Sequence, residues 1–560
     1  MRDRHSGSFS EQEKTFLHSR PWRQLRPFSS FDGFVYAVFA NSIVIAAALT
    51  YSLTWPWPEA NIPLGIVMVC LAFVPMFTVY ALLTTIMPRP GGDYVWQTRI
   101  LGGFWGVAFI VTPLVVGPWF YMASNVAPGS VMVVAPLLIS LSHLLNAPSL
   151  LDVAISVSTP QGTWWFYVFY VTFAAAVMLR GMRFYARFLC WSFAVGMLAL
   201  CIWMVLLVGT GQEEFGTAFN RFMLKALHWG DGQALESIMA SARSEGFTPL
   251  PLSQTTWRSS FLIGPALAYT FMYIAWTGTL AGEIRGVKRF SGSAGIYLGG
   301  NFFAMLVCAG FMWLLISTVG NELFSASNFL WATGKGQQTT LPPHLGLFLM
   351  ALGSSPWYWL LVALGLNAWF WIWPTNNFVM STRVMLAMSN DRLLPALVAR
   401  KSRRLGVPVA AIAVCYLGSL LFGWLYFFTD FARLTLDMPF MTSIAFAAST
   451  LAGTLLPFLK KTRPLYESSP ISKYRILGMP LITVSGCLGL VYFGIMFFLY
   501  LTDDRYGVND LLSGGFITLF IAASALSYLG YRVYRRHQGI DLDRTLQEIP
   551  LHSEQGERIE

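Results

Sequence analysis

The chain has 560 residues, of which 55% are hydrophobic and only 11% charged, and its formal net charge is +10. With 16% aromatic residues and a mean hydropathy of +0.55, this composition is typical of a protein that crosses a membrane several times and argues against a soluble domain. The basic residues are dispersed in short groups beside apolar segments, so the positive charge does not indicate a nucleic-acid-binding surface.

Apolar segments long enough to cross a bilayer recur along the whole chain. The sequence predicts twelve spans: 29–54, 62–87, 104–145, 164–180, 186–209, 259–282, 293–318, 356–388, 407–428, 431–457, 476–501 and 511–534. All six cysteines fall inside these spans without the spacing of metal ligands. We therefore expect buried apolar thiols and neither disulfides nor a metal site.

The third span, 104–145, contains Pro113, Pro118, Pro128 and Pro136, so it could be one broken crossing or two. Lys and Arg concentrate in cytoplasmic loops. With one crossing, thirty of the 37 Lys and Arg fall on the cytoplasmic side, whereas two crossings would reverse this bias. The sequence therefore predicts an even number of crossings, with both termini in the cytoplasm.

Polar or helix-weakening residues interrupt three of the spans. Span 1 carries Asn41-Ser42 about midway, and span 8 carries Asn367 and the run Pro374 to Asn377. Span 6 carries a longer set: Pro265, Tyr269, Thr270, Tyr273, Thr277 and Gly278. Backbone that departs from helix at membrane depth persists only where protein or a watery cavity satisfies it, and interrupted spans point to a transporter's substrate site. A buried helix whose tyrosines bond to neighbours is the alternative.

The prolines and glycines of the junction after span 2, PRPGGDYVW, end the helix of that span. Asp93 can cap a new helix, and we expect residues 94–101 to form a short amphipathic helix at the inner surface. A plain tight turn is the alternative. The outer segment 210–258 has mixed charge and is expected to fold partly over the outer mouth.

Three cytoplasmic junctions resemble those of the amino acid–polyamine–organocation transporter superfamily. They are PRPGGDYVWQTRILGGFWG after span 2, AGEIRGVKR after span 6, and STRVMLAMSNDRLLPALV after span 8. The resemblance covers residues 26–410. It implies an all-α polytopic membrane protein of twelve helices with a five-plus-five inverted repeat, the LeuT-type fold, and two additional C-terminal helices.

The resemblance also implies a domain organisation and a function. The expected regions are a cytoplasmic tail (1–28), a first repeat (29–209), an extracytoplasmic loop (210–258), a second repeat (259–457), spans 11 and 12 (458–534) and a cytoplasmic tail (535–560). The expected function is that of a permease in the cell membrane that moves an amino acid or a related small amine or organic solute by alternating access. Coupling to H⁺ or Na⁺, or solute exchange, would drive it; no other cofactor is expected.

In this family the unwound middles of spans 1 and 6 hold the substrate. Carried over through the matching junctions, this places the substrate site at Asn41, Ser42, Ile43, Tyr269, Thr270, Phe271, Met272 and Tyr273, with Trp276 about a turn deeper. Span 1 has no glycine after Gly33, and Tyr273 stands where the family commonly has glycine. We therefore expect a small or flat substrate that is bound partly by side chains.

The gate and coupling residues are predicted from the same junctions. Glu283 resembles the family's inner-gate acid and is expected to pair with Arg89, Arg99 or Arg383. The hydroxyls available for Na⁺ on span 8 are those of Thr375, Ser381 and Thr382, and span 5 has no lysine for a proton-coupled mechanism. Asp437 in span 10 is either an intramembrane functional acid or a charge near the outer interface.

Two other classes of membrane protein are alternatives to a transporter. A polytopic membrane enzyme would need a histidine or paired acids facing a reaction chamber, and none of the seven histidines lies mid-span. A channel would show a filter-like repeat or rings of charge, which the sequence does not contain. The predicted partners are a small-molecule substrate and the lipid bilayer, with no nucleic acid.

Overall fold

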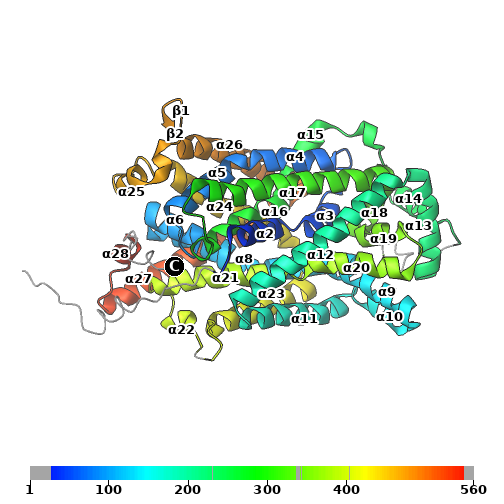
Figure 1. The fold of residues 1–560 in the computed structure, drawn as a ribbon, viewed down its shortest axis with the longest axis horizontal. Helices are drawn as coiled ribbons and strands as arrows, with labels where there is room; N and C mark the ends of the chain where they lie inside the picture. The colour runs from blue at the N-terminus through cyan, green and yellow to red at the C-terminus, as the bar shows by residue number, and fades with distance from the viewer. Residues whose placement is uncertain (1–26, 230, 336–340, 342, 403, 548–560) are drawn as a thin grey trace, which may run out of the picture.

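The computed structural model describes residues 27–547 except 230, 336–340, 342 and 403. The predicted tails 1–28 and 535–560 therefore lie partly outside the described residues. The described part is a bundle of helices with one small hairpin of strands (Figure 1).

The first half of the chain, up to the loop 210–258, is almost entirely helical. In chain order these are α2 (Ser30–Asn41), α3 (Ile43–Leu53), α4 (Ile62–Ala72), α5 (Val74–Ile86), α6 (Gly92–Ile100), α7 (Gly103–Ala108), η1 (Val111–Val116), α8 (Gly117–Gly129), η2 (Ser130–Val134), α9 (Ala135–Leu145), α10 (Ser149–Ser156), α11 (Pro160–Leu179) and α12 (Met182–Gly209). The loop 210–258 itself folds into α13 (Gln212–Leu227), α14 (Ala234–Ser244) and η3 (Leu252–Gln254).

The second half begins at α15 (Trp257–Leu262). It continues through α16 (Gly264–Phe271), η4 (Tyr273–Glu283), α17 (Phe290–Val319), α18 (Asn321–Thr333), α19 (Leu345–Ala351), α20 (Pro356–Phe370), α21 (Trp373–Asn390), α22 (Ala396–Ala399), α23 (Val409–Phe428), η5 (Asp430–Thr435) and α24 (Asp437–Leu455). The remaining elements are α25 (Arg463–Ser468), η6 (Pro470–Lys473), the antiparallel strands β1 (Arg475–Ile476) and β2 (Met479–Pro480), α26 (Leu481–Thr502), η7 (Asp504–Tyr506), α27 (Leu511–His537) and α28 (Leu542–Gln547).

Within the described residues, ten helical segments are long and apolar enough to cross a membrane, and they match ten of the twelve predicted spans. The two predicted spans without such a segment are 259–282 and 356–388. Both are broken into shorter pieces, the first at Met272 between α16 and η4, the second at Trp371-Ile372 between α20 and α21. Only ten segments are counted within the described residues because these two spans are interrupted. A total of twelve crossings remains a prediction.

The proline-rich third span is one continuous helical segment, Gly103–Leu145, of 43 residues. Two of its turns, η1 and η2, are π-helical. Pro113 lies within η1, and Pro136 follows η2 in the first turn of α9. Proline lacks the amide donor of an α-helix, and a widened turn accommodates the lost bond. At 1.5 Å per residue the segment is about 64 Å long, roughly twice the hydrocarbon core, so part of it extends beyond the core or is strongly tilted.

The predicted loops gather at two opposite ends of the bundle. Figure 1 shows α6, α22, α25 and α28 at one end, hereafter the α6 end, and α13 and α14 across the other. Large apolar side chains such as Leu198, Val205, Leu306, Leu417 and Leu519 point outward from the long helices between these ends. An exposed apolar belt of this kind suits contact with lipid.

The helix predicted at residues 94–101 is present as α6, but the prediction that it is amphipathic is wrong. Every residue of α6 is buried, including Asp93, Gln97, Thr98 and Arg99. Its polar side chains are satisfied by distant parts of the chain instead of water: Gln97 Nε2 donates to the carbonyl of Ala445 at 2.7 Å.

Candidate functional site

Two broken helices meet at the centre of the bundle. The α2 helix ends at Asn41, and Ser42 has φ 48° and ψ 91°, outside the helical region. The α16 helix ends at Phe271, after which η4 continues as a 3₁₀-helix. Since α2 packs against η4 and α3 packs against α16, the two chains run in opposite directions with their breaks at the same level.

Local sequence explains both interruptions. Asn and Ser side chains compete for backbone hydrogen bonds and disfavour a helix interior, which fits the break at Asn41-Ser42. In η4, Gly278 and Gly282 weaken helical propensity, and a long 3₁₀ stretch within a helix often marks a functional hinge.

Several polar atoms at the break in α2–α3 have no partner. Both amide atoms of Asn41 and the hydroxyl of Ser42 are buried without a hydrogen bond to any residue that the structure describes. Each unsatisfied buried group costs about 1–3 kcal/mol, so native proteins rarely keep such groups without a ligand or water to bind them.

Free backbone amides lie at the same place. The first backbone bond at the start of α3 runs from Ala46 N to Ser42 O at 2.6 Å. The amides of residues 43–45 therefore have no acceptor inside α3. With the helix dipole they provide partial positive charge suited to a carboxylate, while the carbonyl ends of α2 and α16 suit an ammonium group. Ile43, one of the predicted site residues, provides one of these backbone amides.

Five aromatic rings surround the break between α16 and η4, and all are buried: Tyr121, Tyr269, Tyr273, Trp276 and Trp373. The ring centroids of Tyr273 and Trp276 are 4.6 Å apart, those of Tyr121 and Tyr273 5.4 Å, and those of Trp276 and Trp373 5.8 Å. We call these five residues the aromatic cluster. The faces of electron-rich aromatic rings can bind a cation.

Other predicted residues of span 6 are held by the protein itself. Tyr269 OH bonds to Ser124 Oγ at 2.6 Å, Thr270 Oγ1 donates to the carbonyl of Leu267, and Met272 Sδ accepts from Ser443 Oγ at 3.6 Å. Phe271 is fully buried. These side chains fix the position of the break, whereas Tyr273 OH, Trp276 Nε1 and Thr277 Oγ1 beyond it are buried without a partner among the described residues.

One side of the site was missed from the sequence. Tyr121, Ser124 and Asn125 on α8 face the breaks: Tyr121 OH bonds to Thr442 at 2.7 Å, and Asn125 Oδ1 is buried without a partner among the described residues. Their spacing of i, i+3 and i+4 marks one helical face, and this signal was available in the sequence.

A buried ion pair lies below the aromatic cluster toward the α6 end. Arg383 Nε donates to Glu283 Oε1 at 2.6 Å, and a second guanidinium nitrogen donates to Oε2 at 3.2 Å. The side chains are only 6% and 5% exposed. Of the three candidate partners of Glu283, the structure thus selects Arg383; Arg89 lies half-buried in the loop before α6.

Arg99, the third candidate, forms a second pair at the same end. Its guanidinium donates to both oxygens of Asp391 at 2.6 and 2.7 Å, and Tyr94 OH donates to the same carboxylate at 2.7 Å. Burial alone would lower the pKa of Arg99, but the hydrogen bonds and charge of Asp391 raise it above its ordinary value. The two ion pairs tie α6 and η4 to α21.

The loop before α6 closes directly onto the 3₁₀ segment. Gly91 N donates to the carbonyl of Thr279 at 3.0 Å. Gly92 has φ 31°, and a Cβ at this position would overlap the backbone of Gly278. Gly92 is therefore required for the close approach of two backbones, and Gly91 is required by its φ of 90°.

The predicted coupling residues are not gathered at one place. Ser381 Oγ donates to the carbonyl of Val115 at 2.9 Å, and Thr382 Oγ1 donates to its own helix at Phe378. Only Thr375 keeps a buried hydroxyl without a partner in the described part of the chain. Asp437 is 1% exposed and lies in the first turn of α24, five residues before Thr442.

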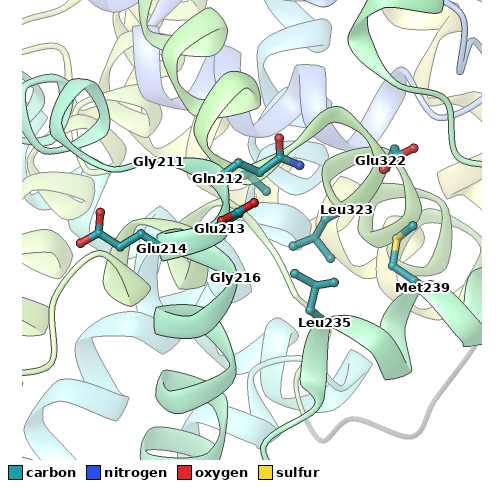
Figure 2. A pocket seen from close by; sticks show the side chains of 10 residues that line it. Gly211, Gln212, Glu213, Glu214, Gly216, Leu235, Met239, Glu322 and Leu323 are labelled. Atoms are coloured by element: carbon teal, nitrogen blue, oxygen red, sulfur yellow. The ribbon is translucent and has the colours of Figure 1, made fainter.

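A separate pocket of about 840 Å³ opens at the other end of the bundle, between α13, α14 and α18. Figure 2 shows Glu213, Glu214 and Glu322 around it, with Leu235 and Met239 on its apolar side. The lining residues belong to the outer helices and are distinct from the two breaks.

A family model described as amino acid permease matches residues 31–523 of the chain. No curated protein matches the chain at a significant level. The matched range includes both breaks, the aromatic cluster, α6 and the two ion pairs.

Proposed function

Because the chain belongs to the amino acid permease family, within the superfamily of amino acid–polyamine–organocation transporters, we propose that it carries an amino acid or a related small amine across the cell membrane by alternating access. The substrate site is the space between the α2–α3 break and the α16–η4 break. The observation that carries this proposal is the facing of these breaks, where the buried amide of Asn41 and the hydroxyl of Ser42 lack partners among the described residues.

The chemistry of the site supports a substrate with a carboxylate and an ammonium group. The carboxylate would accept hydrogen bonds from the amides at the start of α3 and from Asn41 Nδ2, and the ammonium group would lie against the carbonyl ends of α2 and α16 and the faces of the aromatic cluster. Tyr273 and Trp276 have no exposed surface, and their bulky rings narrow the space between the breaks. The substrate is therefore small or flat.

Twelve crossings and the five-plus-five inverted repeat are part of the same proposal. Their support is that span 1 and span 6 are both broken, run in opposite directions and lie side by side, as two halves related by inversion would place them. The concentration of Lys and Arg at the α6 end supports a cytoplasmic location for that end.

The alternating step requires a gate at each end. We propose that the Glu283–Arg383 and Arg99–Asp391 pairs hold the α6 end closed while the substrate enters from the other end. Both pairs are bidentate and little exposed, so opening must separate them or move them together.

Uptake of labelled amino acids and amines into proteoliposomes tests the proposal, with thermal-shift screening of the same compounds to identify ligands. For the ligand found, Asn41→Ala should weaken binding about five- to 150-fold, because removing a partner from a buried polar ligand costs about 1–3 kcal/mol. Asn328→Ala, which removes a buried amide of α18 outside both breaks, is the matched control. Unchanged affinity in a folded Asn41→Ala protein would place the site elsewhere.

A further inference from the structure

Asp93, in the first turn of α6, has no exposed surface. The hydroxyls of Tyr80 on α5 and Ser449 on α24 both donate to its Oδ1, the latter at 2.7 Å. Its Oδ2 is buried and has no hydrogen-bond partner among the described residues. Neutral donors therefore bind one oxygen of the buried carboxyl group, and the other oxygen has no donor among the described residues.

No ion pair within the described part of the chain involves Asp93. The groups that face it are neutral: Tyr80, Ser449 and, on α17, Tyr297, whose hydroxyl bonds to Thr84 at 2.9 Å. Of the cations on and beside α6, Arg99 pairs with Asp391, Lys461 Nζ donates to the carbonyl of Arg99, and Arg89 lies half-buried in the preceding loop.

Burial without a cation favours the neutral carboxyl. It raises the pKa of Asp93 to about 6, although the hydrogen bonds from Tyr80 and Ser449 lower it in part. If α6 moves away from α5 and α24 and water reaches the group, its pKa returns to about 3.9. The docked position of α6 is therefore favoured at low pH, and this advantage is lost as the pH rises through about 6.

We propose that Asp93 is a proton-binding site whose occupancy controls the docking of α6 against α5 and α24. A proton on Oδ2 stabilises the state closed at the α6 end. When that end opens, the carboxyl becomes hydrated and the proton leaves to the water there. The inference rests on the proposed function in one respect, namely that opening of the α6 end is a step of transport; it then makes H⁺ the coupling ion.

The test measures opening directly and needs no substrate. Ala281 is 1% exposed in η4, beneath the loop before α6, so a cysteine introduced there reacts with a charged thiol reagent only when the α6 end opens. The modification rate of full-length Ala281→Cys is compared with that of Ala281→Cys/Asp93→Asn at each pH. Asparagine mimics the neutral carboxyl, and the ratio of the two rates cancels the pH dependence of the thiol. The protein without Ala281→Cys gives the background from native cysteines.

The rate for Ala281→Cys divided by the rate for Ala281→Cys/Asp93→Asn is expected to rise about tenfold between pH 5 and pH 8. This follows because the pKa of Asp93 is about 6 when α6 is docked and about 3.9 when the carboxyl is hydrated. A ratio that stays constant over this range overturns the proposal. Asp152→Asn, which neutralises an exposed carboxylate on α10, should leave the pH response in place.

Ser449→Ala provides an independent variant if Asp93→Asn does not fold. It removes a hydrogen bond that lowers the pKa of Asp93, so the pH at which opening increases should move upward. A midpoint that does not move overturns the proposal as well. If the pH-dependent ratio is observed but no solute is transported, the proton site stands and the proposed function fails, so the two failures are distinguishable.

Discussion

The buried pair of Glu283 and Arg383 offers the sharpest test of the inner gate. The substitution Glu283→Gln keeps the size of the side chain and one acceptor oxygen but removes the negative charge. Because both side chains are about 5% exposed, the guanidinium of Arg383 then stays in a dry environment without a counter-ion. The closed state loses stability, whereas an open state in which Arg383 is hydrated is little affected.

The size of the effect follows from the burial of the pair. Removing one partner of a buried ion pair costs about 3–5 kcal/mol, and the amide oxygen recovers part of this cost through its remaining hydrogen bond. A net loss of about 3 kcal/mol would shift the equilibrium between closed and open states by a factor on the order of 100. The double variant Glu283→Gln/Arg383→Gln leaves no uncompensated charge and should shift the equilibrium less than the single variant.

The assay is the modification rate of Ala281→Cys by a charged thiol reagent, measured at one pH in detergent. The rate should increase strongly in the Glu283→Gln background, and equilibrium binding of ligand from the other end should weaken in parallel. Glu467→Gln is the matched control, since its pair with Arg463 has a similar length, 2.7 Å against 2.6 Å, but is exposed to solvent at the same end of the bundle. Equal rates in the Glu283→Gln and Glu467→Gln backgrounds would refute the gating role of the buried pair.

Three further predictions follow from other contacts. Gly92→Ala should displace α6 from the backbone of Gly278 and abolish transport, while Gly295→Ala in α17, where an added methyl meets no neighbour, should transport normally. His344 is buried, which lowers its pKa to about 3, so folding stability should fall as the pH drops below about 6.5; His344→Asn should flatten this dependence in thermal unfolding. Impermeant labelling of single cysteines should find 210–258 outside and 390–406 inside, and the reverse result would invert the predicted topology.

The two helix breaks were predictable because a local signal marks each of them. The pair Asn41-Ser42 carries its own helix-breaking chemistry, and the junction AGEIRGVKR fixed the register that places Tyr273 and Trp276 at the second break. Both signals lie within about ten residues of the feature they predict. Local propensity and spacing are sufficient for such features.

The features that were predicted wrongly or missed depend on distant partners or on altered helical geometry. The polar residues of α6 suggested a wet surface, yet the groups that satisfy Gln97 lie about 350 residues later in the chain, beyond the reach of any local pattern. The spacing of Tyr121, Ser124 and Asn125 marks one face of α8, but the direction of this face could not be predicted because two π-helical turns flank the helix. Each π turn adds a residue to the helical repeat and rotates everything that follows.

The interrupted helix formed by α20 and α21 has a consequence for how the protein is made. In the proposed topology α21 crosses part of the bilayer with Asn376, Asn377 and Arg383 on one short helix. On translocon-insertion scales a lone arginine costs about 2.5–3.5 kcal/mol at the centre of a nascent helix and less toward its end, where Arg383 lies. Glu283, synthesised a hundred residues earlier, can neutralise this charge only if η4 is nearby. We therefore expect the earlier broken helix to remain close to the insertion site until α21 is made.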